Sequence, residues 1–449
     1  MAVPFPAGAV DNRRRAWPGE RGGRIVAGVL TTFSGTGDPP RHNWAGNVRY
    51  RARRFHRPTT LDELRRLVAD STRLRAVGSG HSFNTLGDTE GDLVTLTGLP
   101  STFRLDRERG TVTVAAGLRY GDVATRLHTH GYALPNLASL PHISVAGSIA
   151  TGTHGSGTGN GNLATAVSGL TIVTADGDLL HVDRDTTPDF AGMVVSLGAL
   201  GVVTEVTLDV VQTFEVRQYV HLDLPREALD EALGSAYSVS VFTDWRTPRL
   251  GQVWRKQLAA DPPPPPDWLG TTAARTPQHP VPGMPPQSCT VQFGAPGPWH
   301  ERLPHFRLGF NPSNGEELQS ELHLPRRAVA DALHALDPIA DRIAAVVQIC
   351  EVRTIAADRL WLSPQYGRDT VALHFTWIAD PAAVTPVVAE VEQRLALFAP
   401  RPHWGKVFTV DPATLATAYP RWHDFLALRA RLDPGGVFDT PDLDRYLPR

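Results

Sequence analysis

The chain has 449 residues, of which 41% are hydrophobic and 20% charged, the balance of an ordinary globular protein long enough for two domains. Its formal net charge of −2, with no dense stripe of Lys and Arg, argues against a nucleic acid or an anionic membrane as partner. No apolar run approaches the roughly 18 residues that span a bilayer. The two cysteines, Cys289 and Cys350, have no spacing typical of a disulfide framework or a zinc site, so no metal ion is expected.

The first 40 residues are expected to form a poorly ordered extension. Arg13-Arg14-Arg15 is similar to the opening of a twin-arginine signal, but only a short apolar run at residues 25–30 follows it. No A-x-A cleavage site comes after that run. A cytoplasmic location is therefore expected.

Helix and strand patterns alternate from residue 60 to residue 211, which predicts an α+β fold for this part of the chain. Thr60 and Glu63 form a capping box in front of leucines at helical spacing, which indicates the start of a helix. The further predicted elements are strands at 74–77, 93–97 and 111–115, a helix at 122–130 closed by Gly131, a hairpin of residues 170–174 and 179–182, and a long strand at 202–211.

A glycine-rich loop, Gly78-Ser79-Gly80-His81-Ser82-Phe83-Asn84, follows the first of these strands. A backbone with so few Cβ atoms can lie flat against a phosphate or a ring, and His81 at its crest then touches whatever the loop holds. Taken alone, the loop is equally consistent with a strand-to-turn junction that carries an incidental surface histidine.

A second block of small residues, at 135–157, decides between these alternatives. Its Gly, Ala, Ser and Thr residues leave backbone N–H groups and hydroxyls free to bind an anion such as a pyrophosphate without any lysine. The block does not have the spacing of a Rossmann fingerprint. Apolar residues argue against a flexible low-complexity loop; they are Leu137, Leu140, Ile143, Val145 and Ile149.

The composition changes after residue 214, where a second domain is expected. Five consecutive prolines at 262–266 favour a rigid surface loop that enters no sheet. Beyond them, strands are predicted at 318–324, 347–355 and 371–377, with a helix at 326–335 between the first two.

Two of these strands carry a pair of polar side chains on one face. Successive residues of a strand point to opposite faces, so Glu351 shares a face with Arg353, and His374 shares a face with Thr376. Apolar residues occupy the opposite faces. The pattern alone favours an amphipathic sheet whose polar face meets solvent, and the alternative is a polar binding surface.

The two glycine-rich blocks together resemble the FAD-binding domain of the vanillyl-alcohol oxidase family of flavoproteins. Residues 279–285, 297–306 and 401–409, the last with Trp404-Gly405-Lys406, are similar to the alditol oxidase subgroup of that family. The likeness extends from about Asn43 to the C-terminus.

The resemblance implies an α+β fold with a two-lobed FAD-binding domain at 41–215. An α+β substrate domain with an antiparallel sheet would follow at 216–400, and residues 401–449 would return to the FAD-binding domain.

The resemblance also implies roles for residues of both glycine-rich blocks. In the family, a histidine of the first loop is bound covalently to the flavin 8α-methyl group, and His81 matches it. The second block holds the pyrophosphate. The implied FAD contacts are His81, Gly78, Ser79, Gly80, Ser82, Phe83, Asn84, Ala138, Ser139, Ser144, Gly147, Ser148, Ala150, Thr151, Gly152, Thr153, His154 and Gly155.

For the substrate, the resemblance implies a polyol site made of Ser139, Glu351, Arg353, His374, Thr376 and Lys406. A polyol is a chain of hydroxyls, each of them donor and acceptor, and this set supplies a carboxylate, cationic donors and groups that do both. The implied reaction oxidises the terminal primary alcohol of xylitol, sorbitol or a related alditol to the aldehyde. The hydride would pass to flavin N5, and O2 would be reduced to hydrogen peroxide.

Four of these residues are implied to be catalytic. Lys406 and His374 are the candidates for the base, and Arg353 would lower the pKa of Lys406 by like-charge repulsion. Glu351 would fix the neighbouring hydroxyl and so orient the reacting C–H bond.

Two alternatives stay open. A sugar-lactone oxidase or dehydrogenase of the same fold would share the histidyl flavin and a related Glu/Arg pair. A non-catalytic carbohydrate-binding protein would keep only the fold, and an intact His81 and Lys406 argue against it. The sequence determines neither the preferred chain length, nor the oligomeric state, nor the physiological electron acceptor.

Overall fold

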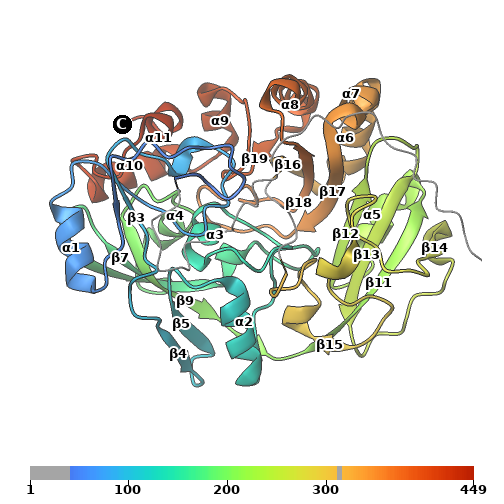
Figure 1. The fold of residues 1–449 in the computed structure, drawn as a ribbon, viewed down its shortest axis with the longest axis horizontal. Helices are drawn as coiled ribbons and strands as arrows, with labels where there is room; N and C mark the ends of the chain where they lie inside the picture. Colours follow the sequence, from blue (N-terminus) through green and yellow to red (C-terminus); the bar gives the residue numbers. More distant parts are fainter. Residues whose placement is uncertain (1–40, 311–315) are drawn as a thin grey trace, which may run out of the picture. The chain divides into compact units, whose positions relative to one another are not determined.

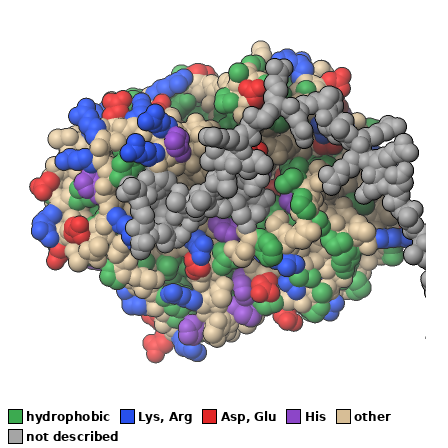
Figure 2. All heavy atoms as spheres, viewed as in Figure 1, with side chains coloured by type: hydrophobic (Ala, Val, Ile, Leu, Met, Phe, Trp, Pro, Cys, Tyr) green, Lys and Arg blue, Asp and Glu red, His purple; other side chains and the backbone are tan. Residues whose placement is uncertain are grey.

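The computed structural model describes residues 41–310 and 316–449 (Figure 1). The extension expected at 1–40 lies outside the described residues. Within the described part of the chain, no helix combines the length and the apolar character needed to cross a membrane. On the face drawn in Figure 2, acidic side chains lie among the basic ones and not in a region of their own.

Two sheets organise the chain before residue 214. Strands β1 (Arg54–His56), β3 (Asp92–Val94) and β2 (Leu74–Ala76) form a parallel sheet in that spatial order. The second sheet is antiparallel, in the order β4 (Phe103–Asp106), β5 (Thr111–Ala115), β9 (Val202–Asp209), β7 (Val167–Val173) and β8 (Leu179–Asp183). The same part contains the pair β6 (Tyr132–Ala133) and β10 (Val211–Gln212) and the helices α1 (Leu61–Ala69), α2 (Tyr120–Thr129), α3 (Val145–Ala150) and α4 (Phe190–Val194).

Local sequence explains where the first helices begin and end. Thr60 is the N-cap of α1, and its hydroxyl accepts a hydrogen bond from the Glu63 backbone N–H at 3.1 Å. The Glu63 carboxylate reaches back to the start of the helix and accepts the N–H of Thr59, one residue before the N-cap, at 2.8 Å. Gly131 follows α2 with φ 83°, a left-handed conformation that residues with a Cβ rarely adopt. The predicted strands at 74–77 and 93–97 are confirmed in shorter form.

A nine-stranded antiparallel sheet dominates the described residues after 214. Its spatial order is β14 (Thr272–Ala273), β11 (Glu215–Leu224), β13 (Leu250–Leu258), β12 (Ser238–Thr243), β17 (Val347–Ile355), β18 (Thr370–Ile378), β16 (Glu317–Pro325) and β19 (Arg401–Pro402), with β15 (Gly297–Pro298) paired to β11. The three strands predicted in this region are confirmed, and they are neighbours in the order β17, β18, β16. The proline run at 262–266 forms no strand, as predicted.

Helices cover one face of this sheet. They are α5 (Leu229–Gly234), α6 (Val329–Leu336), α7 (Ala340–Val346) and α8 (Pro381–Leu395), and Figure 1 shows the last three along strands β16 to β18. Val352, Leu373 and Phe375 are fully buried in the apolar core beneath them. Because side chains alternate along a strand, the polar residues between them point to the opposite face.

The C-terminal helices lie beside the N-terminal part. Figure 1 shows α10 (Trp422–Leu432) and α11 (Pro441–Tyr446), in red, next to blue elements, with α9 (Pro412–Ala418) nearby. The backbone N–H of Leu74 in β2 donates to Val437 O at 2.7 Å. Phe425 and Leu443 share one apolar core with Val114 of β5. The chain thus returns, after the nine-stranded sheet, to the elements with which it began.

Candidate active site

A cavity of about 630 Å³ is lined by both glycine-rich blocks and by the polar face of the nine-stranded sheet. Nearly all of the predicted site residues contribute to its wall. They are Gly78, Ser79, Gly80, His81, Ser82, Phe83 and Asn84; Ala138, Ser139, Ser144, Gly147, Ser148, Ala150, Thr151, Thr153 and His154; and Glu351, Arg353, His374, Thr376 and Lys406.

Gly152 and Gly155 are predicted to contact the cofactor but are absent from the cavity wall. Both serve close packing, Gly155 against Asn136 of the same block and Gly152 against Pro364. A Cβ on Gly155 would lie 2.2 Å from Asn136 Oδ1, and one on Gly152, where φ is 67°, would lie 3.1 Å from the ring of Pro364. These glycines let the chain fold tightly behind the wall, which sequence alone does not separate from ligand contact.

The two glycine-rich blocks interlock through a pair of serines. The Ser79 N–H donates to Ser144 Oγ at 3.3 Å, and the Ser144 N–H donates to Ser79 Oγ at 3.1 Å. A Cβ on Gly78 would lie only 2.0 Å from Ser144 Oγ, so the blocks can approach this closely only with glycine at that position. The result is a wall of exposed backbone and small hydroxyls, suited to a flat ring and a phosphate.

His81 lies in the cavity wall, and one of its ring nitrogens makes no hydrogen bond among the described residues. Its ring stacks on Trp44, with centroids 5.0 Å apart and planes 18° from parallel. Burial, and next the neighbouring His142, lower the pKa of His81 to about 4, so the ring is neutral at neutral pH. Its Nδ1 is buried and has no hydrogen-bond partner among the described residues. A neutral, buried imidazole with a free nitrogen fits a residue that carries a covalently attached group.

The first glycine-rich loop also holds the segment that carries Lys406. The Asn84 side-chain amide donates to Trp404 O and to Lys406 O, each at 2.8 Å. The Phe83 N–H donates to Gly405 O at 2.7 Å. These bonds set the lysine beside the loop of His81, although the two residues are far apart in the sequence.

The polar residues of the sheet form a cross-strand row on the cavity side. Glu351 of β17 is opposite His374 of β18, and His374 is opposite Glu321 of β16. Glu351 and Arg353 are each 4% exposed and Thr376 is 8% exposed. The expectation that this face meets solvent is therefore wrong. It borders the cavity because the glycine-rich blocks, which precede the sheet in the sequence, cover it.

Arg353 connects this row to the second glycine-rich block. Its Nη1 donates to Ser139 Oγ at 3.0 Å. Its guanidinium also lies 3.4 Å from a Glu351 oxygen and 3.5 Å from a Glu321 oxygen. Two carboxylates and a guanidinium thus compensate one another away from water, as buried charges require.

Lys406 and His374 both have pKa values below their ordinary range. Burial lowers the pKa of Lys406, its ion pair with Glu321 opposes that change, and Arg353 lowers the pKa further, as the like-charge argument predicts. Burial, and next Lys406, lower the pKa of His374 to about 4. The His374 Nδ1 lies 3.4 Å from a Glu351 oxygen, which accepts only, so Nδ1 carries the hydrogen of the neutral ring. Nε2 then has a lone pair and no hydrogen bond among the described residues.

Sequence reasoning missed three residues of this site. Glu321 alternates with apolar residues in β16 as Glu351 does in β17, so the same strand argument could have found it. His305 Nε2 lies 2.7 Å from Glu351 Oε1, and Trp44 stacks on His81. These last two come from loops and have no periodic signal.

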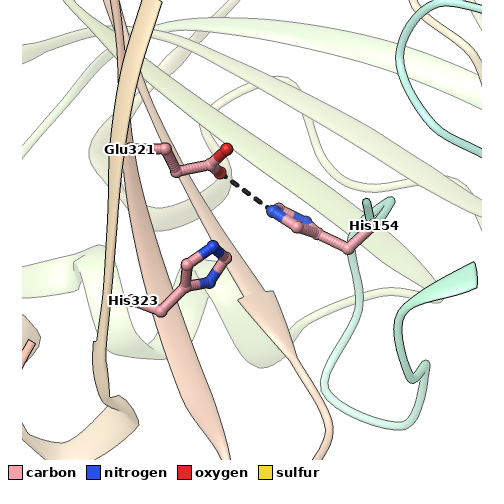
Figure 3. Close-up of side chains that lie close together, drawn as sticks. All are labelled: His154, Glu321 and His323. Atoms are coloured by element: carbon pink, nitrogen blue, oxygen red, sulfur yellow. Dashed lines mark hydrogen bonds and ion pairs between the residues drawn. The ribbon is translucent and has the colours of Figure 1, made fainter. Parts of the chain in front are cut away.

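His154, Glu321 and His323 form a cluster whose nitrogen and oxygen atoms lie within 4.8 Å of one another, a spacing at which such groups could bind a metal ion (Figure 3). The hydrogen bonds around His323 indicate that its Nε2 carries a hydrogen and is not free to bind a metal ion. Gln365 Oε1 accepts from Asn162 at 2.9 Å, which orients the amide so that its Nε2 donates to His323 Nδ1 at 2.8 Å. The hydrogen of a neutral His323 is then on Nε2, the nitrogen that would have to offer a lone pair to a metal.

A family match and a solved structure both agree with this architecture. The family described as FAD binding domain matches residues 52–183, which include both glycine-rich blocks. A cholesterol oxidase from B. sterolicum shares the fold, with a TM-score of 0.72 at 15% identity over 91% of this chain and 96% of that one. The fold and the cavity thus define an FAD-binding oxidoreductase of the vanillyl-alcohol oxidase type.

The closer matches specify the branch. An alditol oxidase from a Streptomyces species is 53% identical over 401 residues, which cover 88% of this chain and 96% of the relative. An L-gulono-1,4-lactone dehydrogenase from Mycobacterium tuberculosis is 30% identical over the same shares of the two chains. The family described as D-arabinono-1,4-lactone oxidase matches residues 315–446. The chain belongs to the alditol oxidase family.

Proposed function

We propose that this chain oxidises the terminal primary alcohol of linear polyols such as xylitol and sorbitol to the aldehyde, with O2 as the electron acceptor. The observation that carries the proposal is the buried row of Glu351, Arg353, His374 and Thr376 at a cavity also lined by Lys406. An apolar steroid would leave such groups unsatisfied, whereas successive hydroxyls can pair with each of them. The identity to the Streptomyces alditol oxidase supports the same substrate class.

The glycine-rich blocks fit the cofactor. FAD, when bound, supplies the acceptor for the hydride of the substrate carbon. Its isoalloxazine and phosphates would be held by the backbone of the first loop and by the small residues of the second block. We propose a covalent attachment at His81, because its neutral ring has a buried nitrogen that makes no hydrogen bond among the described residues.

The polar side chains of the cavity have different roles in the removal of the hydroxyl proton and in binding the substrate. His374 Nε2 has the free lone pair and is the better placed acceptor for the proton of the reacting hydroxyl. Lys406 and Arg353 bring positive charge to the oxygen on which alkoxide character develops. Glu351 accepts a hydrogen bond from the adjacent hydroxyl, and Ser139 and Thr376 contact the hydroxyls further along the chain.

A sugar-lactone oxidoreductase is the second candidate, since the Mycobacterium tuberculosis relative and the matching lactone oxidase family are named for lactones. Anaerobic bleaching of the purified yellow protein tests the choice. Xylitol and sorbitol should reduce the flavin rapidly and glycerol more slowly, because fewer hydroxyls hold its reacting carbon in place. Reduction by an aldonolactone but by no alditol would overturn the proposal, and a protein that no sugar derivative bleaches would be a binding protein.

Three further assignments stay predictions. The FAD-binding domain comprises residues 41–215 with the C-terminal segment 401–449, and residues 216–400 form the substrate domain. The protein works in the cytoplasm. Its reduced flavin is reoxidised by O2, which oxygen consumption with equimolar hydrogen peroxide would verify.

A further inference from the structure

We propose that Glu321 is a positioning residue that holds the Lys406 side chain in place as an ammonium ion. The proposal rests on the proposed function. It adds a role for Glu321, a residue that was not among those predicted to bind the polyol. Glu321 Oε2 lies 2.5 Å from Lys406 Nζ. The carboxylate is fully buried, with a side chain 0% exposed, so this ion pair forms out of contact with water.

Glu321 is the point where three segments of the chain meet. Its second oxygen, Oε1, lies 2.9 Å from His154 Nε2 in the second glycine-rich block and 3.5 Å from Arg353 Nη2 in β17. Lys406 comes from the segment after β19. One carboxylate therefore fixes a cation on each of two segments of the substrate site and a ring beside the cofactor site.

The hydrogen bonds of His154 connect Glu321 to the second glycine-rich block. His154 Nδ1 lies 2.8 Å from Gly155 O, a carbonyl that accepts only, so Nδ1 carries a hydrogen. Nε2 faces the Glu321 carboxylate, which also accepts only when it is ionised. Burial opposes ionisation of Glu321, but Lys406 and then His154 hold the pKa of this carboxyl well below its ordinary value.

The charge of Glu321 decides how far pH can rise before Lys406 loses its proton. Burial and Arg353 lower the pKa of Lys406, and Glu321 raises it. Removing the negative charge must therefore lower the pKa of Lys406 further. His323 contacts the rings of His154 and His403 beside this cluster. The other titratable or charged groups that line the cavity are Tyr50, Arg75, His81, Arg119, His142, His154, His279, His305, Glu316, Glu317, Glu351, His374 and His403.

The experiment compares Glu321→Gln with the parent, with Glu205→Gln as the matched control. Glu205 lies in β9, pairs with Arg104 and does not line the cavity. The parent should first be shown to bleach with xylitol. In Glu321→Gln, with FAD occupancy equal to the parent, the limiting rate of flavin reduction should fall at least tenfold. The loss of rate at alkaline pH should begin at lower pH, while Glu205→Gln leaves both unchanged.

A double-mutant cycle separates positioning from a merely structural effect. In a Lys406→Met background, Glu321→Gln should have little further effect on flavin reduction, because the group it positions is gone. The melting temperature of the double variant should also lie above the value obtained by adding the two single losses, since both partners of the ion pair are then removed. This thermal measurement needs no substrate.

The outcomes distinguish the two proposals. A parent bleached only by a lactone overturns the polyol assignment, and the role of Glu321 is then measured with that lactone and by the thermal cycle. An unchanged alkaline limb in Glu321→Gln, or additive losses in the cycle, overturns the positioning role whatever the substrate.

Discussion

Two walls border the same cavity and are built by opposite means. The wall made by the glycine-rich blocks depends on the absence of side chains: Gly78 leaves room for Ser144, and the two blocks line the cavity with small residues. The wall made by the nine-stranded sheet depends on charges that are present and buried, with Arg353 between two carboxylates and Lys406 on one of them.

The difference teaches how each wall fails. A substitution that adds side-chain atoms to the glycine-rich blocks should destabilise the first wall, because there is no space for those atoms. Removed charges harm the second wall, because each one leaves a buried partner uncompensated. Under the proposed function, the first wall would hold the cofactor by shape, and the second would act on the substrate by electrostatics. The following variants break or sharpen this comparison.

The largest expected effect is the complete loss of the covalent link in His81→Ala. Mass spectrometry of the tryptic peptide that contains His81 should show one added FAD in the parent and none in the variant, and acid should release the flavin from the variant alone. His128→Ala, a histidine of α2 away from the cavity wall, is the control and should keep the adduct. A bare peptide in the parent would contradict the attachment.

Lys406→Met comes next and tests the charged wall. Loss of a donor that stabilises developing charge typically lowers turnover about a hundredfold to a thousandfold. The anaerobic rate of flavin reduction at saturating xylitol should fall by that factor, with a smaller change in binding. Lys406→Arg keeps the charge and should lose less. A rate near that of the parent in Lys406→Met would remove the lysine from the chemical step.

Gly78→Ala tests the backbone wall. The new Cβ would meet Ser144 Oγ, which also accepts the Ser79 N–H, so one of these contacts must move. Overpacking of this kind costs about 1–3 kcal/mol, and we expect a lower melting temperature with reduced FAD content. Gly159→Ala is the matched control because nothing lies within 4 Å of the Cβ it would add and Gly159 does not line the cavity. Equal behaviour of the two variants would show that the interlocked serines are not essential.

Thr376→Ala should have the smallest effect. The residue contributes a hydroxyl to the row and no charge, so its loss should raise KM for xylitol about tenfold with kcat nearly unchanged. Thr113→Ala, whose hydroxyl pairs with Thr207 in the antiparallel sheet before residue 210, should leave both parameters alone. A large drop in kcat would place Thr376 among the groups that act on the reacting carbon.

Much of the fold and of the site could be predicted from sequence, because it depends on neighbours along the chain. Strand period alone placed Glu351 with Arg353 and His374 with Thr376, and the structure confirms both pairs. The many small residues of the two glycine-rich blocks predicted that these blocks would line a ligand site, and both blocks line the cavity. The Thr60 cap and the Gly131 helix end follow from single residues and their immediate surroundings.

The tertiary structure decided whether the polar face of the sheet meets solvent or a cavity. Strand period has no information on what covers a face, and here the glycine-rich blocks from the N-terminal part of the chain cover it. It also decided the partners of Glu321, since the spatial order β17, β18, β16 sets it beside His374, while Lys406 arrives from another segment. His305 and Trp44 reach the site from loops, and Gly152 and Gly155 turn away from the cavity, because their positions depend on contacts between residues distant in sequence.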